Sequence, residues 1–464
     1  MRKTGKWGGG LAGGAAAALA ALLGAALAFA AAQEPGGRAA GERLPNVVIA
    51  TIDALRCDRL SAYGYRRATS PNIDRLLAAG ARFTQARTVE PLTNPALCSM
   101  FTSMYPHEHG ATRNGLRLRP GLPSLARILA RQGYQTAAFV GNWTLADRIS
   151  GLGEHFQRYG EVLTRRRWFG LFRREATAED LTDAALAWLG AADPGRPFLL
   201  WVHYVEPHAP YRLQEPFAAR LGIATGGEVA KADRYDTEVA FADHHLGRLL
   251  AALDALGADR AHRSGTLVVF SADHGESLGE HNYWGHGRNL YEPTLRIPLG
   301  FTWTGKIRPG TVDGSALLLD VAPTVLGLCG LGGSPTFRGF DWTAVLAGAV
   351  PPPRNRVAWF EAHRGAVLSM REAGGARRGG LLEVGMLSGS RKEVFRPGER
   401  RHWLFELDSD PLETARPTAG APPSGRLRDW LATVQRGLAA SDRFAAADLD
   451  AESLAQLRSL GYME

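Results

Sequence analysis

NVVIATID, residues 46–53, is an apolar and largely β-branched run that stops at Asp53. Three later segments have the same form: YQTAAFVGN stops near Asn142, PFLLWVHYVEPH near His208, and GTLVVFSADHGE at Asp273 and His274. Continuous apolar strands separated by helical stretches are typical of a parallel sheet that is covered on both faces. We therefore predict an α/β fold with a large, mostly parallel sheet.

The segments between these strands have helical patterns, at residues 71–83, 122–133, 179–191 and 235–256. One face of the last segment is apolar and comprises Val239, Ala242, Leu246, Leu249, Leu250 and Leu253. After residue 350 short apolar runs broken by glycine predict a small antiparallel sheet, and helical patterns follow at residues 425–440 and 451–462. The sequence thus divides into a large catalytic domain at residues 45–350 and a smaller C-terminal subdomain at residues 351–464.

The N-terminal residues differ in composition from the rest. A basic flank, MRKTGKW, precedes an uncharged stretch at residues 11–32 that ends in three alanines. This order is typical of a secretory signal, and the stretch is also long enough to cross a membrane uncleaved, which takes roughly 20 residues. We predict a signal peptide or an N-terminal membrane anchor at residues 1–32 and a polar linker at residues 33–44. The folded part is then exported, to the periplasm or the outer surface.

Charge and cysteine content narrow the function classes. The formal charge is +8, but the arginines are scattered rather than massed in a stripe, which argues against a nucleic-acid partner. The three cysteines, Cys57, Cys98 and Cys329, are widely spaced and form no CxxC pair or disulfide framework. Residues 163–175 are basic and aromatic, which suits an anionic or lipid-bearing substrate, a membrane surface, or an exposed helix packed on the core.

Polar residues at several strand ends suggest a metal site. Ligands of open α/β sheets gather beyond the carboxyl ends of the strands, so Asp53, Asp273 and His274 are expected at one edge. Two carboxylates and an imidazole suit Mn²⁺ or Zn²⁺ better than an all-oxygen Ca²⁺ cage. Each residue alone could instead be a cap or a loop residue, but their occurrence at matched strand ends favours the metal.

A nucleophile is suggested by LTNPALCSMFTSM, residues 92–104. Asn94 is a good N-cap and Pro95 suits the first helical position, so Thr93 is expected just before a helix N-terminus, where an anion is favoured. A threonine hydroxyl attacks only after a metal or base removes its proton. Simple capping is the alternative for Thr93. Cys98 lies about a turn inside the helix among apolar residues, so we expect a buried, inert thiol.

The chain resembles the sulfatases of the alkaline phosphatase superfamily over nearly its whole folded length. The resemblance rests on NVVIATIDALRCDRLSAYGY, SPNIDRLLAAGARFTQA, TSMYPHEHG, HYVEPHAPY, SADHGESLGEHNYWGHGRNLYEPTLRIPL and LFELDSDPLET, in the order of that family. It implies an alkaline-phosphatase-like sandwich with a small C-terminal α+β subdomain, and a metal-bound nucleophile that forms a covalent intermediate.

The resemblance also assigns roles to individual residues. Asp53, Asp273 and His274 match the metal ligands, and the nucleophile, itself a ligand, falls at Thr93. His208 and His286 match residues that contact the anionic group of the substrate or protonate the leaving oxygen. A further match, Asn114, corresponds to a polar substrate-binding residue near the nucleophile.

Several motif positions depart from the usual sulfatase pattern. The signature C/S-x-P-S-R, whose first residue becomes formylglycine, reads TNPAL here, so Thr93 is unmodified and Leu97 replaces the arginine. The two consecutive aspartates of typical sulfatases correspond to Ile52-Asp53 in this chain. The substrate-binding GKWH motif is Gly141-Asn142-Trp143-Thr144, so Asn142 and Thr144 stand where the family has lysine and histidine.

These departures point to branches that use an unmodified threonine or a single first-strand aspartate, such as phosphoethanolamine and glycerophosphate transferases and phosphonate or phosphodiester hydrolases. We predict a metal-dependent hydrolase or transferase of phosphate or sulfate esters, with phosphoesters favoured. One divalent ion is expected, Mn²⁺ or Zn²⁺ before Ca²⁺, and no formylglycine. The substrate is an anionic ester, such as an envelope glycan or a lipid head group. An unmodified-threonine sulfatase and a non-catalytic anion- or glycan-binding relative are the alternatives.

Overall fold

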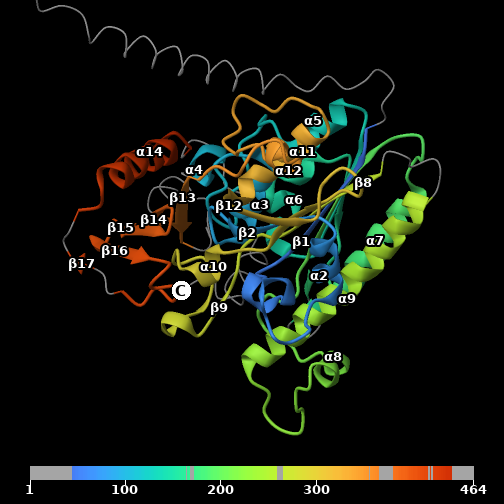
Figure 1. The fold of residues 1–464 in the computed structure, drawn as a ribbon, viewed down its shortest axis with the longest axis horizontal. Coiled ribbons are helices and arrows are strands. Elements are labelled where there is room, and N and C mark those ends of the chain that lie inside the picture. The colour runs from blue at the N-terminus through green and yellow to red at the C-terminus, as the bar shows by residue number, and fades with distance from the viewer. Residues whose placement is uncertain are drawn as a thin grey trace, which may run out of the picture.

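An eight-stranded sheet forms the centre of the chain in the computed structural model, as Figure 1 shows. The structure describes residues 44–163, 165–167, 172–258, 265–354, 356–364, 380–415, 418–419 and 422–441. The strand order is β12 (Gly310–Leu317), β2 (Ala81–Arg87), β11 (Leu299–Thr302), β8 (Thr266–Ala272), β1 (Asn46–Ile52), β7 (Phe198–Tyr204), β3 (Gln135–Val140) and β4 (Arg158–Glu161). The strands from β8 to β4 are parallel to one another, and β11 is antiparallel to its neighbours. The predicted mostly parallel sheet is confirmed.

Helices cover both faces of this sheet. One layer contains α2 (Pro71–Ala78), α7 (Ala178–Ala191) and α9 (Lys231–Ala258), and Figure 1 shows α7 and α9 side by side. The other layer contains α3 (Thr93–Thr102), α5 (Leu125–Arg131) and α11 (Val321–Leu328). The predicted apolar face of α9 is buried except at Leu250, which is half-buried.

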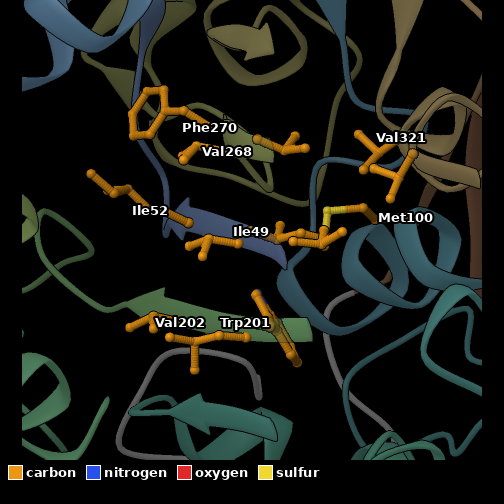
Figure 2. Close-up of a cluster of buried hydrophobic side chains, with 14 of the residues drawn as sticks. Ile49, Ile52, Met100, Trp201, Val202, Val268, Phe270 and Val321 are labelled. Atoms are coloured by element: carbon orange, nitrogen blue, oxygen red, sulfur yellow. The ribbon is translucent and has the colours of Figure 1, made fainter. Parts of the chain in front are cut away.

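Strand β1 lies in the middle of the core. All seven of its residues are buried. Figure 2 shows Ile49 and Ile52 of β1 among side chains of the flanking strands, including Trp201 and Phe270. Burial of a side chain such as isoleucine stabilises the fold by roughly 1.5–3 kcal/mol. The sheet therefore holds the carboxyl end of β1, and the residue that follows it, firmly in place.

Some predicted element ends were wrong. The helix predicted at residues 71–83 ends at Ala78, and Ala81 to Phe83 belong to β2 instead. The chain turns at Gly80, whose backbone passes close to β11. A Cβ added to Gly80 would lie 2.3 Å from Phe301 O, so there is no room for the helix to continue. Strand β7 ends at Tyr204, four residues before His208, because the chain turns through a hydrogen bond of 2.9 Å from His208 N to Val205 O.

The C-terminal region forms the predicted small antiparallel sheet. Its strands are β13 (Val357–His363), β14 (Leu381–Ser388), β15 (Arg391–Arg396), β16 (Arg401–Glu406) and β17 (Thr418–Ala419), and α14 (Gly425–Ser441) packs on it. Glu361 N donates to Val89 O at 3.0 Å, and Lys392 Nζ donates to Glu292 Oε1 at 2.9 Å, which ties this sheet to the larger domain. The helix predicted at residues 451–462 lies outside the described residues.

Shorter elements connect the layers. They are α4 (Pro106–His109), α6 (Asp147–Ser150), α8 (Glu215–Arg220), α10 (Glu292–Leu295), α12 (Thr343–Leu346), the pair β9 (Ser277–Leu278) and β10 (Trp284–Gly285), and the pair β5 (Arg165–Arg167) and β6 (Phe172–Glu175). Within residues 163–175, the described stretches Arg165–Arg167 and Phe172–Glu175 are thus strands rather than parts of a helix.

The predicted signal peptide or anchor at residues 1–32 lies outside the described part of the chain, as does the linker up to residue 43. Among the helices of the described ranges, none is long and apolar enough to cross a membrane.

Candidate active site

The predicted metal ligands meet at the carboxyl edge of the sheet. Asp53 directly follows β1, and Asp273 and His274 directly follow β8, the neighbouring parallel strand in which Ala272 lies opposite Ile52. Thr93 begins α3 at the same place, and its Oγ1 lies 3.3 Å from His274 Nε2. All four side chains are fully buried. The structure thus brings together the four residues that the sequence singled out as metal ligands.

Hydrogen bonds fix which oxygen of Asp53 faces the site. Oδ2 accepts from Asn142 Nδ2 at 2.5 Å, and His203 Nε2 lies 3.5 Å from the same oxygen. Oδ1 has no hydrogen-bond partner among the described residues and lies 3.6 Å from His274 Nε2. One side of this carboxylate is therefore held in place by protein groups, and the other side is left for a ligand.

Asp273 and His274 are also held by hydrogen bonds to one polar atom of the side chain, which leaves the other polar atom for a ligand. Asp273 Oδ1 accepts from Ala54 N at 3.1 Å and from His274 N at 2.7 Å, while Oδ2 has no partner in the described chain. His274 Nδ1 faces the carbonyl oxygen of Gly275 at 2.9 Å, so Nδ1 carries the proton and Nε2 presents a lone pair. Orienting a histidine through its second nitrogen is the usual support of a metal ligand.

The donor atoms fit one divalent cation. His274 Nε2 lies 3.4 Å from Asp273 Oδ2, 3.6 Å from Asp53 Oδ1 and 3.3 Å from Thr93 Oγ1. Ligands held about 2.0–2.2 Å from a tetrahedral ion are separated from one another by about 3.3–3.6 Å. Two carboxylate oxygens, one imidazole nitrogen and one hydroxyl suit Zn²⁺ or Mn²⁺.

Burial and mutual repulsion explain why these carboxylates need a cation. Burial raises the pKa of Asp273 well above its usual range, and the nearby Asp53 raises it further. Burial also raises the pKa of Asp53, but the neighbouring histidines, His208 first, bring that pKa below its usual range. Burial lowers the pKa of His274 well below its usual value, which keeps the imidazole neutral, the form that binds metals.

The sequence analysis missed His203. This residue lies inside β7, opposite Thr51 of β1, and one of its ring nitrogens lies within 4.8 Å of carboxylate oxygens of Asp53 and Asp273, so these three side chains form a group that could hold a metal ion. Thr51 Oγ1 accepts from Trp201 Nε1 at 2.9 Å and is hydrogen-bonded to His203 Nδ1, also at 2.9 Å. His203 Nε2 lies 3.5 Å from Asp53 Oδ2, so His203 is placed to orient that carboxylate.

We expect the His203→Ala variant to bind the metal about 10–100-fold more weakly, as is typical when a group that orients a ligand is lost. The His203→Gln variant should recover part of the affinity, because its amide can still donate to Asp53. Titration calorimetry with Mn²⁺ and Zn²⁺ measures this. His155 is a matched control, since it is a buried histidine whose Nδ1 bonds a hydroxyl, Ser124 Oγ, at 2.8 Å. An equal loss in His155→Ala would contradict a specific role for His203.

Helix α3 differs from the prediction at its start. Leu92 has the extended backbone of an N-cap, and the predicted cap at Asn94 is wrong, because the Asn94 side chain donates to Leu116 O at 3.1 Å and accepts from Cys98 Sγ at 3.3 Å. Thr93 consequently lies in the first turn, still at the N-terminus. Cys98 is fully buried, and burial raises the pKa of its thiol well above the usual value, so the thiol is unsuited to attack.

The two predicted catalytic histidines lie beside the metal-binding residues. The ring centroid of His286 is 4.2 Å from that of His274 and 5.1 Å from that of His208. His286 Nδ1 pairs with Glu276 Oε1 at 3.1 Å, whereas His208 Nδ1 donates to the carbonyl oxygen of Ala209 at 2.7 Å. The Glu276 carboxylate therefore orients the His286 ring.

Of the residues predicted to bind substrate, Asn142 lies beside Asp53 and Thr144 contacts Asn142. Asn114 is fully buried, and its amide oxygen and nitrogen have no partner among the described residues, as expected of a group that faces a ligand. Asn142 is engaged with Asp53, and its Oδ1 accepts from Thr144 N and Oγ1 at 3.0 and 2.9 Å. These contacts show Asn142 orienting the Asp53 carboxylate and Thr144 orienting Asn142, and their contact with substrate stays a prediction. Leu97 is fully buried.

Buried acidic and histidine donors at the carboxyl edge of a mostly parallel sheet are typical of an α/β enzyme that binds its ligands at this edge. The family model "Sulfatase" matches residues 45–331, and the chain belongs to the sulfatase family. The enzymes of this family use a divalent metal.

Individual relatives agree with this assignment. The chain is 24% identical over 418 residues to an N-acetylglucosamine-6-O-sulfatase of Bacteroides thetaiotaomicron. The alignment covers 68% of this chain and 74% of that protein. A solved structure in complex with D-glucosamine-2-N,6-O-disulfate has a TM-score of 0.66 at 19% identity, over 86% of this chain and 100% of the other. A phosphonate monoester hydrolase of Silicibacter pomeroyi has a TM-score of 0.61 at 20% identity, over 88% of this chain and 98% of the other. These likenesses confirm the predicted alkaline-phosphatase-like fold.

Proposed function

We propose that this protein is a metal-dependent hydrolase of phosphate and sulfate esters that uses the unmodified hydroxyl of Thr93 as its nucleophile, with phosphoesters preferred. One observation supports this most directly: Thr93 Oγ1 lies 3.3 Å from His274 Nε2, where carboxylate oxygens of Asp53 and Asp273 also converge. A divalent cation bound by these four residues would lower the pKa of the hydroxyl and offset the charge of the ester.

The chain's own residues supply the rest of the reaction. After losing its proton, Thr93 Oγ attacks the phosphorus or sulfur atom, and the bond from that atom to the leaving oxygen breaks. His286, supported by Glu276, gives its proton to the leaving oxygen, while His208 contacts a non-bridging oxygen of the ester. Water then attacks the same phosphorus or sulfur atom while His286 takes up a proton from that water, and the bond from that atom to Thr93 Oγ breaks, which releases phosphate or sulfate and regenerates the Thr93 oxygen. An acceptor alcohol in place of water would make the same site a transferase.

The departures from the usual sulfatase signature support the preference for phosphoesters. The position of the signature arginine is taken by Leu97, which is buried among apolar side chains, and the position of the family lysine is taken by Asn142, which bonds Asp53. Two cationic contacts to a sulfate group are thereby replaced by neutral residues. We also propose that the protein acts outside the cytoplasm, because of the basic and then apolar N-terminal residues, on an envelope glycan or lipid head group.

A panel of aryl esters tests the proposed function. Phosphate monoesters, phosphodiesters, phosphonates and sulfates would be supplied to the metal-free protein and to the protein with Mn²⁺, Zn²⁺ or Ca²⁺. We expect turnover that requires Mn²⁺ or Zn²⁺ and is fastest with a phosphoester. Faster release of sulfate would overturn the phosphoester preference. Metal binding without turnover of any ester would overturn hydrolysis and favour a transferase or a non-catalytic anion-binding protein.

A further inference from the structure

A cavity of about 700 Å³ opens next to the two catalytic histidines. Its lining includes Ala209, which follows His208, and Gly285, which precedes His286. Its wall continues toward the metal-binding residues through Tyr211, whose ring centroid lies 5.7 Å from that of Tyr235. The hydroxyl of Tyr235 donates to the carbonyl oxygen of Ala54, the residue after Asp53, at 2.7 Å. The cavity therefore lies on the side of the site that carries His208 and His286, the side on which the proposed leaving group departs.

The lining offers an unusual aromatic surface. Trp284, on β10, lines the cavity and is 46% exposed. Pairing of Trp284 with Leu278 in the short β9–β10 sheet fixes the backbone beneath the indole. A rigid, half-exposed indole beside a catalytic site is a surface on which a flat ring can stack.

Two cations lie at the same cavity. Lys231 Nζ is 4.8 Å from the centre of the Trp284 ring, and Arg234 Nε donates to the carbonyl oxygen of Val229 at 3.1 Å, which orients its guanidinium. Neither side chain forms an ion pair with a carboxylate in the described part of the chain, and the lining contains one exposed acid, Glu228. The balance of charge in the cavity is positive, so it attracts an anionic group.

We infer that this cavity receives the leaving alcohol of the substrate, and that this alcohol is a ring carrying a second acidic group, stacked on Trp284 with its acidic group near Lys231 and Arg234. The volume is within the range of about 300–1,000 Å³ typical of small-molecule sites. The inference rests on the proposed cleavage of an ester at Thr93, since that cleavage defines which part of the substrate leaves. An acidic sugar and an aromatic acid share this chemistry.

Two measurements on the full chain test the inference. The first is titration calorimetry with the product alcohols 4-hydroxybenzoate and methyl glucuronide, each compared with its neutral counterpart, phenol or methyl glucoside. The second is kcat/KM for the preferred ester of each of these four alcohols. We expect the acidic alcohols to bind more tightly than the neutral ones, and the tighter of the two acids identifies the source of the ring. Equal binding of acidic and neutral alcohols would overturn the inference.

Matched variants separate the cation from the ring. We expect Lys231→Ala to weaken binding and raise KM by about fivefold for the acidic compounds only. This is the change in affinity expected when a partly exposed ion pair is lost. Trp284→Ala should weaken binding of all four ring compounds, acidic and neutral alike. The controls are Lys306→Ala, an exposed lysine 5.9 Å from the ring of Trp303 at the opposite edge of the sheet, and Trp188→Ala, a half-buried tryptophan on α7. Equal effects of the control variants would overturn the inference.

The two measurements also distinguish this inference from the proposed function. Binding that depends on Lys231 and Trp284, without turnover of any ester, would overturn the proposed function and support the ligand class alone. Turnover at Thr93 that is insensitive to Lys231 and Trp284 would support the proposed function and overturn the inference.

Discussion

Replacing Thr93 by alanine is expected to lower kcat/KM for the preferred ester by at least about 10³-fold, the scale seen when a covalent nucleophile is removed. The variant loses the attacking oxygen and one donor to the metal but keeps Asp53, Asp273 and His274. Metal affinity should therefore fall much less than the rate does. Steady-state kinetics at saturating Mn²⁺, together with calorimetric metal binding, measures the two effects separately.

The Thr93→Ser variant is the matched control for this substitution. Serine keeps the hydroxyl in the first turn of α3 and removes only a methyl group, so most of the activity should remain. If Thr93→Ala turned over the ester as fast as the wild type, the nucleophile would be another group. Equal losses in Thr93→Ser and Thr93→Ala would point to packing rather than chemistry at this position.

Replacing Asp273 by asparagine is expected to weaken metal binding by at least about 10²-fold and to abolish turnover with it. The reason lies in the hydrogen bonds of this side chain. Oδ1 accepts from the backbone N–H groups of Ala54 and His274, so the oxygen of an asparagine would stay there. Its NH₂ group would then replace Oδ2 and point two hydrogens at the cation.

The metal-free Asp273→Asn variant should have a melting temperature at or above that of the metal-free wild type. The substitution removes the repulsion between two buried carboxylates, which raises the pKa of Asp273 in the wild type. Scanning calorimetry with and without Mn²⁺ measures this, with Asp254→Asn, an exposed carboxylate on α9, as the control. A lower melting temperature without metal would show that the variant fails by misfolding, and an undiminished stabilisation by metal would contradict the ligand assignment.

The sequence was sufficient to predict which strand-end residues lie together, because the relevant geometry is set by simple rules. Asp53 and Asp273 each follow a continuous apolar strand, and parallel strands bring their carboxyl ends to the same edge of a sheet. Strands β2, β11 and β12 were not predicted. In the sequence, the residues of β2 follow a helical pattern without a clear break. Whether such a segment becomes a strand depends on long-range pairing, such as that of Arg82 with Gly300 of β11.

The roles of His203 and Asn142 could not be predicted in the same way. His203 lies inside a strand whose residues are all buried, so its surroundings resemble the core, and only the pairing of β7 with β1 places it next to Asp53. Asn142 stands at a motif position that suggested substrate binding, yet the folded chain turns its amide toward Asp53. In both cases the partner is more than 80 residues away in the sequence, and no local pattern records the contact.

The most direct test of the account is to identify the residue that carries the covalent intermediate. The wild-type protein would be mixed with the preferred ester, quenched in acid during turnover and digested, and the peptide containing residue 93 analysed by mass spectrometry. The account predicts an unmodified threonine in the resting protein and a phosphorylated or sulfated Thr93 during turnover, with no label in Thr93→Ala. A label on another residue, or steady turnover of the ester by Thr93→Ala, would contradict it.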